Sequence, residues 1–108
     1  MITVATPAEL FKTPATTVTD FPFPDHTLDM AYIKVHGRYP EKDLTINHKC
    51  HEVCYILEGQ GRINDHELTP GLAVQIPPGE PYYFEGNFTM IVSCTPKFSP
   101  DQVGKYEN

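Results

Sequence analysis

The stretch INHKCHEVCYILEGQG, residues 46–61, decides the fold of this chain. It leads from a group of polar residues into a β-rich apolar run at 52–58, which ends at two closely spaced glycines that indicate a turn. Both faces of this run are largely apolar, so we expect both to be covered. One face would line a barrel interior. The other would lie under the N-terminal arm or against a second subunit.

A second glycine-punctuated run, GLAVQIPPGEPYYFEGN at residues 71–87, has the same character. We expect a strand at 72–76. Pro77, Pro78 and Gly79 then have the order that a type II turn requires. After the turn, alternating apolar and polar residues indicate the last two strands at 82–84 and 88–94.

The rest of the chain is also read as short elements separated by turns. Eleven prolines and seven glycines interrupt it, and no stretch has a sustained 3.6-residue apolar period, which favours a β-sandwich or barrel. We expect strands at 1–5, 28–36 and 44–48, helical turns at 7–11 and 99–103, with Ser99 as N-cap and Pro100 at N1, turns at 37–43 and 59–61, and a tight hairpin at Asn64-Asp65.

Size and charge limit the function classes. The 108 residues make one domain: an arm at 1–26 with an edge strand, a barrel at 27–96 and a tail at 97–108. A net charge of -6 with scattered basic residues argues against nucleic acid. No apolar run reaches the ~20 residues of a membrane span, and the start does not look like a secretory leader. Three cysteines without a disulfide spacing suggest reduced thiols and a cytoplasmic location.

In these two runs the chain resembles the cupin superfamily. The first cupin motif is G-x5-H-x-H-x3,4-E-x6-G, and His48, Glu52 and Gly59 stand at matching positions. The second is G-x5-P-x-G-x2-H-x3-N, and Gly71, Pro77 and Gly79 match its opening. The resemblance spans roughly residues 40–87 and implies an all-β, single-domain jelly-roll barrel.

The departures from the motifs fall on metal ligands. Typical cupins hold a metal with three histidines and one glutamate, but here Ile46 and Tyr82 replace two of the histidines. The resemblance therefore implies either one divalent transition metal (Fe, Mn, Ni or Zn) or none. If metal binds, we expect His48 and Glu52 as ligands, with His51 or Tyr82 completing the shell; Cys54 shares the strand face of Glu52 and is a further candidate.

The expected ligand pocket consists of His48, Glu52, Tyr82, Cys54 and Arg62. In the metal-free alternative His48 forms a hydrogen bond with Glu52 or Tyr82. Arg62 is then a partner for the Glu52 carboxylate, because a buried carboxylate needs a partner or a raised pKa. The catalytic residues remain open at this stage.

Three functions are consistent with this pocket. The first is a small cupin that binds an organic ligand in its barrel and acts as a metal-dependent dioxygenase, isomerase or lyase. The second is a metal-free module that binds or senses a sugar-like or acidic molecule. The third is a structural domain with a vestigial pocket. The two-sided apolar strand and the Pro-rich arm also predict a homodimer.

Overall fold

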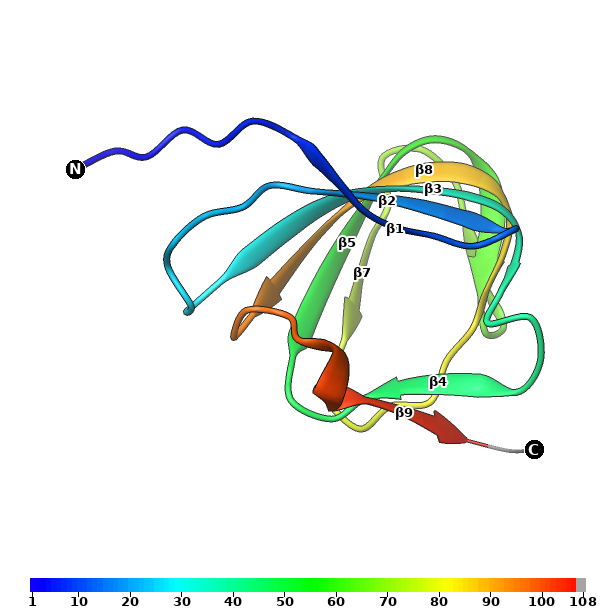
Figure 1. The fold of residues 1–108 in the computed structure, drawn as a ribbon. Helices are drawn as coiled ribbons and strands as arrows, with labels where there is room; N and C mark the ends of the chain where they lie inside the picture. The colour runs from blue at the N-terminus through cyan, green and yellow to red at the C-terminus, as the bar shows by residue number, and fades with distance from the viewer. Residues whose placement is uncertain (107–108) are drawn as a thin grey trace.

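The computed structural model describes residues 1–106, which form an almost entirely β structure (Figure 1). Apart from one 3-10 turn, the regular elements are strands. In chain order they are β1 (Ala8–Lys12), β2 (Thr16–Asp20), β3 (Asp29–Tyr39), β4 (Leu44–Asn47), β5 (His51–Ile63), β6 (His66–Leu68), β7 (Ala73–Ile76), β8 (Phe84–Thr95), η1 (Pro100–Gln102) and β9 (Val103–Tyr106). This part of the chain contains no helix long and apolar enough to span a membrane.

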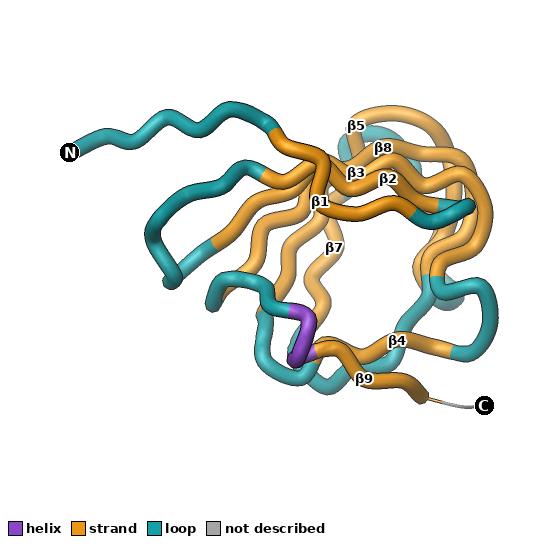
Figure 2. The backbone as a smooth tube through the Cα atoms, in the orientation of Figure 1, coloured by secondary structure: helices purple, strands orange, loops and turns teal. Residues whose placement is uncertain are grey.

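Two sheets enclose the interior. The large sheet has the order β1-β2-β3-β8-β5-β6, with β7 also paired to β5, and the small sheet is β4-β9. The large sheet curls over the small one, so that β4 and β9 face it across the barrel (Figure 2). The expected all-β barrel of a single domain is confirmed.

The longest strands, β5 and β8, run through positions where the sequence predicted interruptions. The expected turn at 59–61 and the expected break between 84 and 88 are wrong, because β5 and β8 pair from His51↔Thr95 to Ile63↔Phe84, with one register shift between Ile56 and Glu58. Within this antiparallel pair, Gly61 lies opposite Gly86. A Cβ added at Gly86 would lie 2.5 Å from the Gly61 Cα, so these glycines permit close approach of two strands.

The N-terminal region also differs from expectation. Residues 1–5 extend away from the barrel instead of forming a strand (Figure 1). The helical turn expected at 7–11 is instead strand β1, which pairs antiparallel with β2. Pairing at a sheet edge overrides local helical preference here.

Several local predictions are confirmed. The hairpin at Asn64-Asp65 joins β5 to β6, with Ile63 paired to His66. Gly79 has φ +83 at the third position of its turn. Ser99 is the extended N-cap of η1, with Pro100 in its first turn. Strand β9 was not predicted. It pairs with β4, which matches the strand expected at 44–48.

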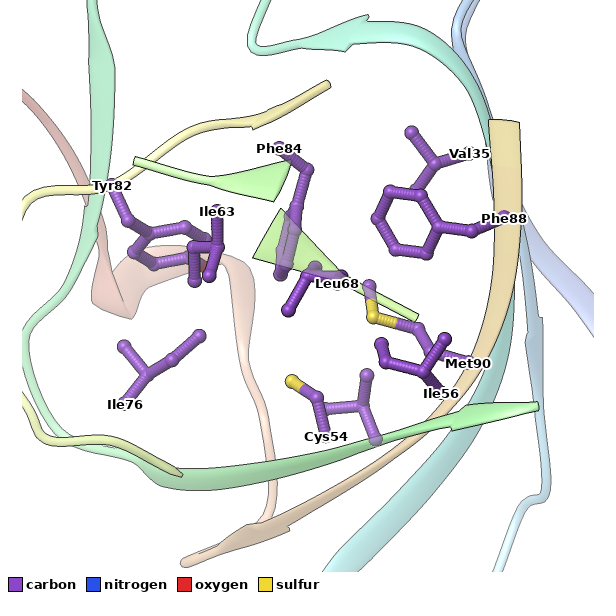
Figure 3. Packing of buried hydrophobic residues seen from close by; sticks show 11 residues of the cluster. Val35, Cys54, Ile56, Ile63, Leu68, Ile76, Tyr82, Phe84, Phe88 and Met90 are labelled. Carbon is purple, nitrogen blue, oxygen red and sulfur yellow. The ribbon is translucent and has the colours of Figure 1, made fainter. Parts of the chain in front are cut away.

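Inward-facing residues of the large sheet form the core (Figure 3). Ile56, Leu68 and Met90 are among the most completely buried side chains. The aromatic rings of Phe84 and Phe88 pack with centroids 5.9 Å apart. Several of its members, among them Phe84 and Met90, also line the cavity of the barrel.

The two faces of β5 differ sharply. Glu52, Cys54 and Ile56 are buried, as expected for the interior face. On the outer face Val53, Tyr55 and Leu57 are 48%, 47% and 42% exposed. Within one chain, therefore, the outer face is open, and the N-terminal arm does not cover it.

Candidate ligand-binding cavity

The barrel holds a cavity of about 140 Å³ against the inner face of the large sheet. Apolar side chains make up most of its wall. The titratable oxygen-bearing side chains among its lining residues are Asp20, Asp29, Tyr39, Glu52 and Tyr82. Among the residues that the structure describes, no Lys, Arg or His lines the cavity. The chemistry of the cavity is therefore that of carboxyls and phenols.

Glu52 is the central carboxyl of this site. It lies near the start of β5, between Cys94 of β8 and Ile76 of β7, and is 9% exposed. The Asn47 side-chain amide donates a 2.9 Å hydrogen bond to its Oε1. Burial raises the pKa of Glu52, and the hydrogen bond from Asn47 offsets part of that rise. Glu52 thus remains protonated to a higher pH than an exposed glutamate.

Two tyrosines flank the carboxyl. Tyr82 is held by paired backbone hydrogen bonds to Thr45, both 2.9 Å long. Its ring packs in a T-shaped arrangement with Phe84, with ring centroids 5.4 Å apart. Burial raises the pKa of Tyr39 and of Tyr82, and the negative charge of Glu52 raises both further. Both phenols therefore keep their protons and can donate hydrogen bonds to a ligand.

Asp29 and Asp20 form a second polar group that the sequence reasoning missed. Asp29 opens β3, is 8% exposed and accepts a 2.9 Å hydrogen bond from the Met30 backbone. Burial raises the pKa of Asp29, and the neighbouring Asp20 raises it further. Strand parity could have found Asp29, because it shares the inward face with Ala31, Ile33 and Val35.

Tyr39 and Asn47 were missed for other reasons. Tyr39 belongs to β3 only because that strand continues through Gly37, where the sequence suggested a turn. Asn47 has no signal of its own as a ligand residue. Its role became visible only when the fold placed it beside Glu52.

The structure places His48 outside the cavity. The Asn47 Oδ1 accepts hydrogen bonds from the backbone of Lys49 at 3.2 Å and of Cys50 at 3.1 Å, which turns the chain just after β4. His48 consequently lies exposed against Gly104 of β9. His51 is also exposed. Neither imidazole lies beside Glu52 in the cavity wall.

Cys54 and Arg62 also lie apart from the cavity wall. Cys54 is fully buried in the apolar core, and burial raises the pKa of its thiol well above the usual range. Arg62 points outward, where its Nε lies 3.7 Å from the Glu85 Oε1 in an exposed ion pair. Of the five expected pocket residues, the structure brings Glu52 and Tyr82 together at the cavity.

These positions do not fit the metal centre that the cupin motifs imply. Among residues 1–106, no group of three or more His, Cys, Asp or Glu side chains is arranged to hold a metal ion. Of the four expected metal ligands, only Glu52 and Tyr82 line the cavity. Transition-metal sites in proteins usually need three or four ligands.

Comparison with known proteins agrees with this fold. Pac13 from Streptomyces, solved with uridine, superposes with a TM-score of 0.84 at 16% identity, over 99% of this chain and 92% of Pac13. Pac13 is a nucleoside dehydratase. Ectoine synthase from P. lautus gives a TM-score of 0.68 at 16% identity, over 82% of this chain and 70% of the synthase.

KdgF from Halomonas sp. gives a TM-score of 0.64 at 14% identity, over 84% of this chain and 89% of KdgF. No protein-family model and no curated protein sequence matches the chain. These structures share the fold of this chain, in agreement with the jelly-roll barrel that the resemblance to cupins implied. The chain thus has the cupin fold, and its described cavity-lining residues include carboxyls and phenols but no histidine.

Proposed function

We propose that this chain binds a small organic molecule in its barrel cavity and that Glu52 exchanges a proton with it. One observation carries the proposal: Glu52 is a buried carboxyl, with its pKa raised, in the wall of the cavity. A general acid or base works best when its pKa lies near the working pH, and burial moves Glu52 in that direction.

The neighbouring groups suit this role. The hydrogen bond from Asn47 fixes the carboxyl, and the phenols of Tyr39 and Tyr82 can orient a substrate oxygen or nitrogen. Proton transfer of this kind supports isomerisation or elimination. The described residues supply no cluster of metal ligands, and the proposed proton transfer requires none.

The test begins with a search for ligands. Wild-type protein is screened by thermal shift against nucleosides, sugars, polyols, amines and small acids, with uridine included because it is the ligand of Pac13. Compounds that stabilise the protein are then followed by NMR for chemical conversion.

The variant Glu52→Gln separates binding from chemistry. We expect it to bind such a compound within a few-fold of wild type and to convert it about 100-fold more slowly. Glu41→Gln makes the same chemical change at an exposed loop position and should behave as wild type. Undiminished conversion by Glu52→Gln would remove the proposal.

A non-catalytic binding module is the second candidate. The observation that favours it is the aromatic wall, to which Phe11, Phe84 and Phe98 contribute and which suits stacking on a flat ligand. Compounds that bind wild type tightly but are never converted, by wild type or by Glu52→Gln, would select this function.

A further inference from the structure

The two carboxyl groups Asp20 and Asp29 have no part in the proposed proton transfer. The register of the large sheet sets their place: Asp29 of β3 pairs with Cys94 of β8, which in turn pairs with Glu52 of β5. Neighbouring strands lie about 4.8 Å apart, so the backbones at Asp29 and Glu52 are separated by roughly 10 Å. The cavity therefore has two acidic positions on opposite sides of one cross-strand row.

Asp20 lies on the next strand, β2, and its Oδ1 is fully buried without a hydrogen-bond partner in the described part of the chain. The charge of Asp20 and a side-chain hydrogen bond between the two carboxyls both raise the pKa of Asp29, so the Oδ1 is the Asp20 atom that lacks a partner. A buried oxygen without a partner is costly, by about 1–3 kcal/mol. Such an oxygen in a cavity wall indicates a donor that belongs to a ligand.

The chain itself does not neutralise this pair. Among residues 1–106, neither Asp20 nor Asp29 takes part in a salt bridge. Lys97 is near enough to lower the pKa of Asp29, but its ammonium donates to the Phe23 carbonyl at 2.8 Å. With Glu52, the described part of the cavity wall thus carries three carboxyls and no basic side chain.

We propose that the ligand of this cavity carries a protonated amine and that Asp20 and Asp29 bind its nitrogen. This inference rests on the proposed function, since it needs a ligand in the cavity. An ammonium group has three N–H donors and a positive charge, and charge-assisted hydrogen bonds to carboxylates are about twice as strong as neutral ones. The apolar wall would hold the carbon skeleton, and Phe11 and Phe98 add aromatic surface that tolerates a cation.

The same charges exclude the acidic ligand considered in the sequence analysis. A carboxylate ligand would meet the negative charge of Asp20 beside two carboxyls whose pKa burial already raises, and no Lys, Arg or His among the described lining residues. A neutral alcohol would satisfy the buried oxygen but would leave the charge uncompensated. An amine does both.

The test uses three probes that share a ring and differ in the polar group: benzylamine, benzyl alcohol and benzoate. Binding to the full chain is measured by isothermal titration calorimetry. We expect benzylamine to bind about tenfold or more tightly than benzyl alcohol, and benzoate not to bind. Equal binding of amine and alcohol, preference for benzoate, or binding of none of the three would overturn the inference.

Near-isosteric variants assign the amine to the carboxyl pair. Asp20→Asn and Asp29→Asn should each weaken benzylamine about tenfold and change benzyl alcohol little. Asp29→Asn keeps an oxygen acceptor for the Met30 backbone, and circular dichroism checks that both variants fold. An unchanged preference for the amine in both variants would show that the nitrogen binds elsewhere.

The variant Glu52→Gln distinguishes this failure from failure of the proposed function. Loss of conversion in Glu52→Gln with no effect of either Asp variant would leave the proton-transfer role intact and refute the amine site. Loss of the amine preference in the Asp variants, with conversion by Glu52→Gln undiminished, would do the reverse.

Discussion

At the scale of single residues, Glu52 shows how burial links stability to function. Its ordinary pKa is near 4.5, and burial raises the pKa in the folded state. The fold therefore favours the protonated form. Stability from this group is fully present below about pH 4.5 and is lost as the pH rises through the raised pKa.

Replacing this carboxyl should stabilise the protein at neutral pH. Glu52→Gln removes the ionisation, and its amide oxygen can still accept the hydrogen bond from Asn47. Urea unfolding at pH 7.5 should show Glu52→Gln more stable than wild type, by about 1.4 kcal/mol for each unit of pKa shift. The difference should shrink toward pH 4.5. Glu41→Gln should show no such pH-dependent gain, and a Glu52→Gln variant less stable at pH 7.5 would contradict the cause assigned here.

Motif spacing placed two of the expected pocket residues in the cavity wall, and their part in ligand binding stays a prediction. Glu52 and Tyr82 were found from the motif spacing, and both line the cavity. His48 was placed wrongly because the turn after Asn47, built from side-chain hydrogen bonds, reverses the direction that strand continuation implies. Asp29 was missed although its parity with Ala31 already placed it inside.

At the scale of elements, β5 and β8 were recognised as strands but their lengths were not. The local sequence around Gly59, Gly61 and Gly86 indicates turns, but these glycines lie where the paired strands β5 and β8 approach each other closely. A local sequence pattern cannot distinguish a glycine needed for a turn from one needed for close approach. Strand β9 was missed because only its partner β4 stabilises it.

The close approach of β8 to β5 leaves no room for a side chain at Gly86. At Gly86 φ is +136, and an added Cβ would meet the Gly61 Cα at 2.5 Å and the Gln60 carbonyl oxygen at 2.6 Å. Gly86→Ala should therefore reduce the free energy of unfolding by about 2–4 kcal/mol, measured by urea titration. Gly71 is the control, because its φ of +93 is also unfavourable but nothing lies within 4 Å of an added Cβ. Gly71→Ala should cost about 1 kcal/mol, and equal losses for both variants would argue against the close-approach explanation.

At the scale of the whole molecule, the outer face of the large sheet exposes apolar side chains that no other part of the described chain covers. Tyr32, Ile91 and Tyr55 are paired in register across β3, β8 and β5, beside the exposed Val53 and Leu57. The extended N-terminal arm adds exposed Met1, Ile2 and Val4. An apolar surface of this extent is unusual on a monomer.

We propose that a second copy of the chain covers this face, as the two-sided apolar strand first suggested. A two-fold axis would place the same apolar rows opposite each other. Sedimentation velocity at micromolar concentration should show a dimer for wild type and a monomer for Tyr55→Glu. Thr69→Glu introduces the same charge at an exposed loop position and should remain dimeric. A monomeric wild type would refute the dimer.

The segregation of polarity along the barrel has a consequence for how such a protein could diversify. Asp29 and Glu52 lie where β3 and β5 begin, whereas Phe84 pairs with Ile63 at the other end of β5, and all three line the cavity. A smaller side chain at Phe84 would admit longer carbon chains without changing the carboxyls that are proposed to bind the polar group of the ligand. Substitutions at Asp20 or Asp29 would change the polar group that the cavity accepts and leave the permitted length of the ligand unchanged. Mutation can therefore change the length of the ligand and its polar group independently.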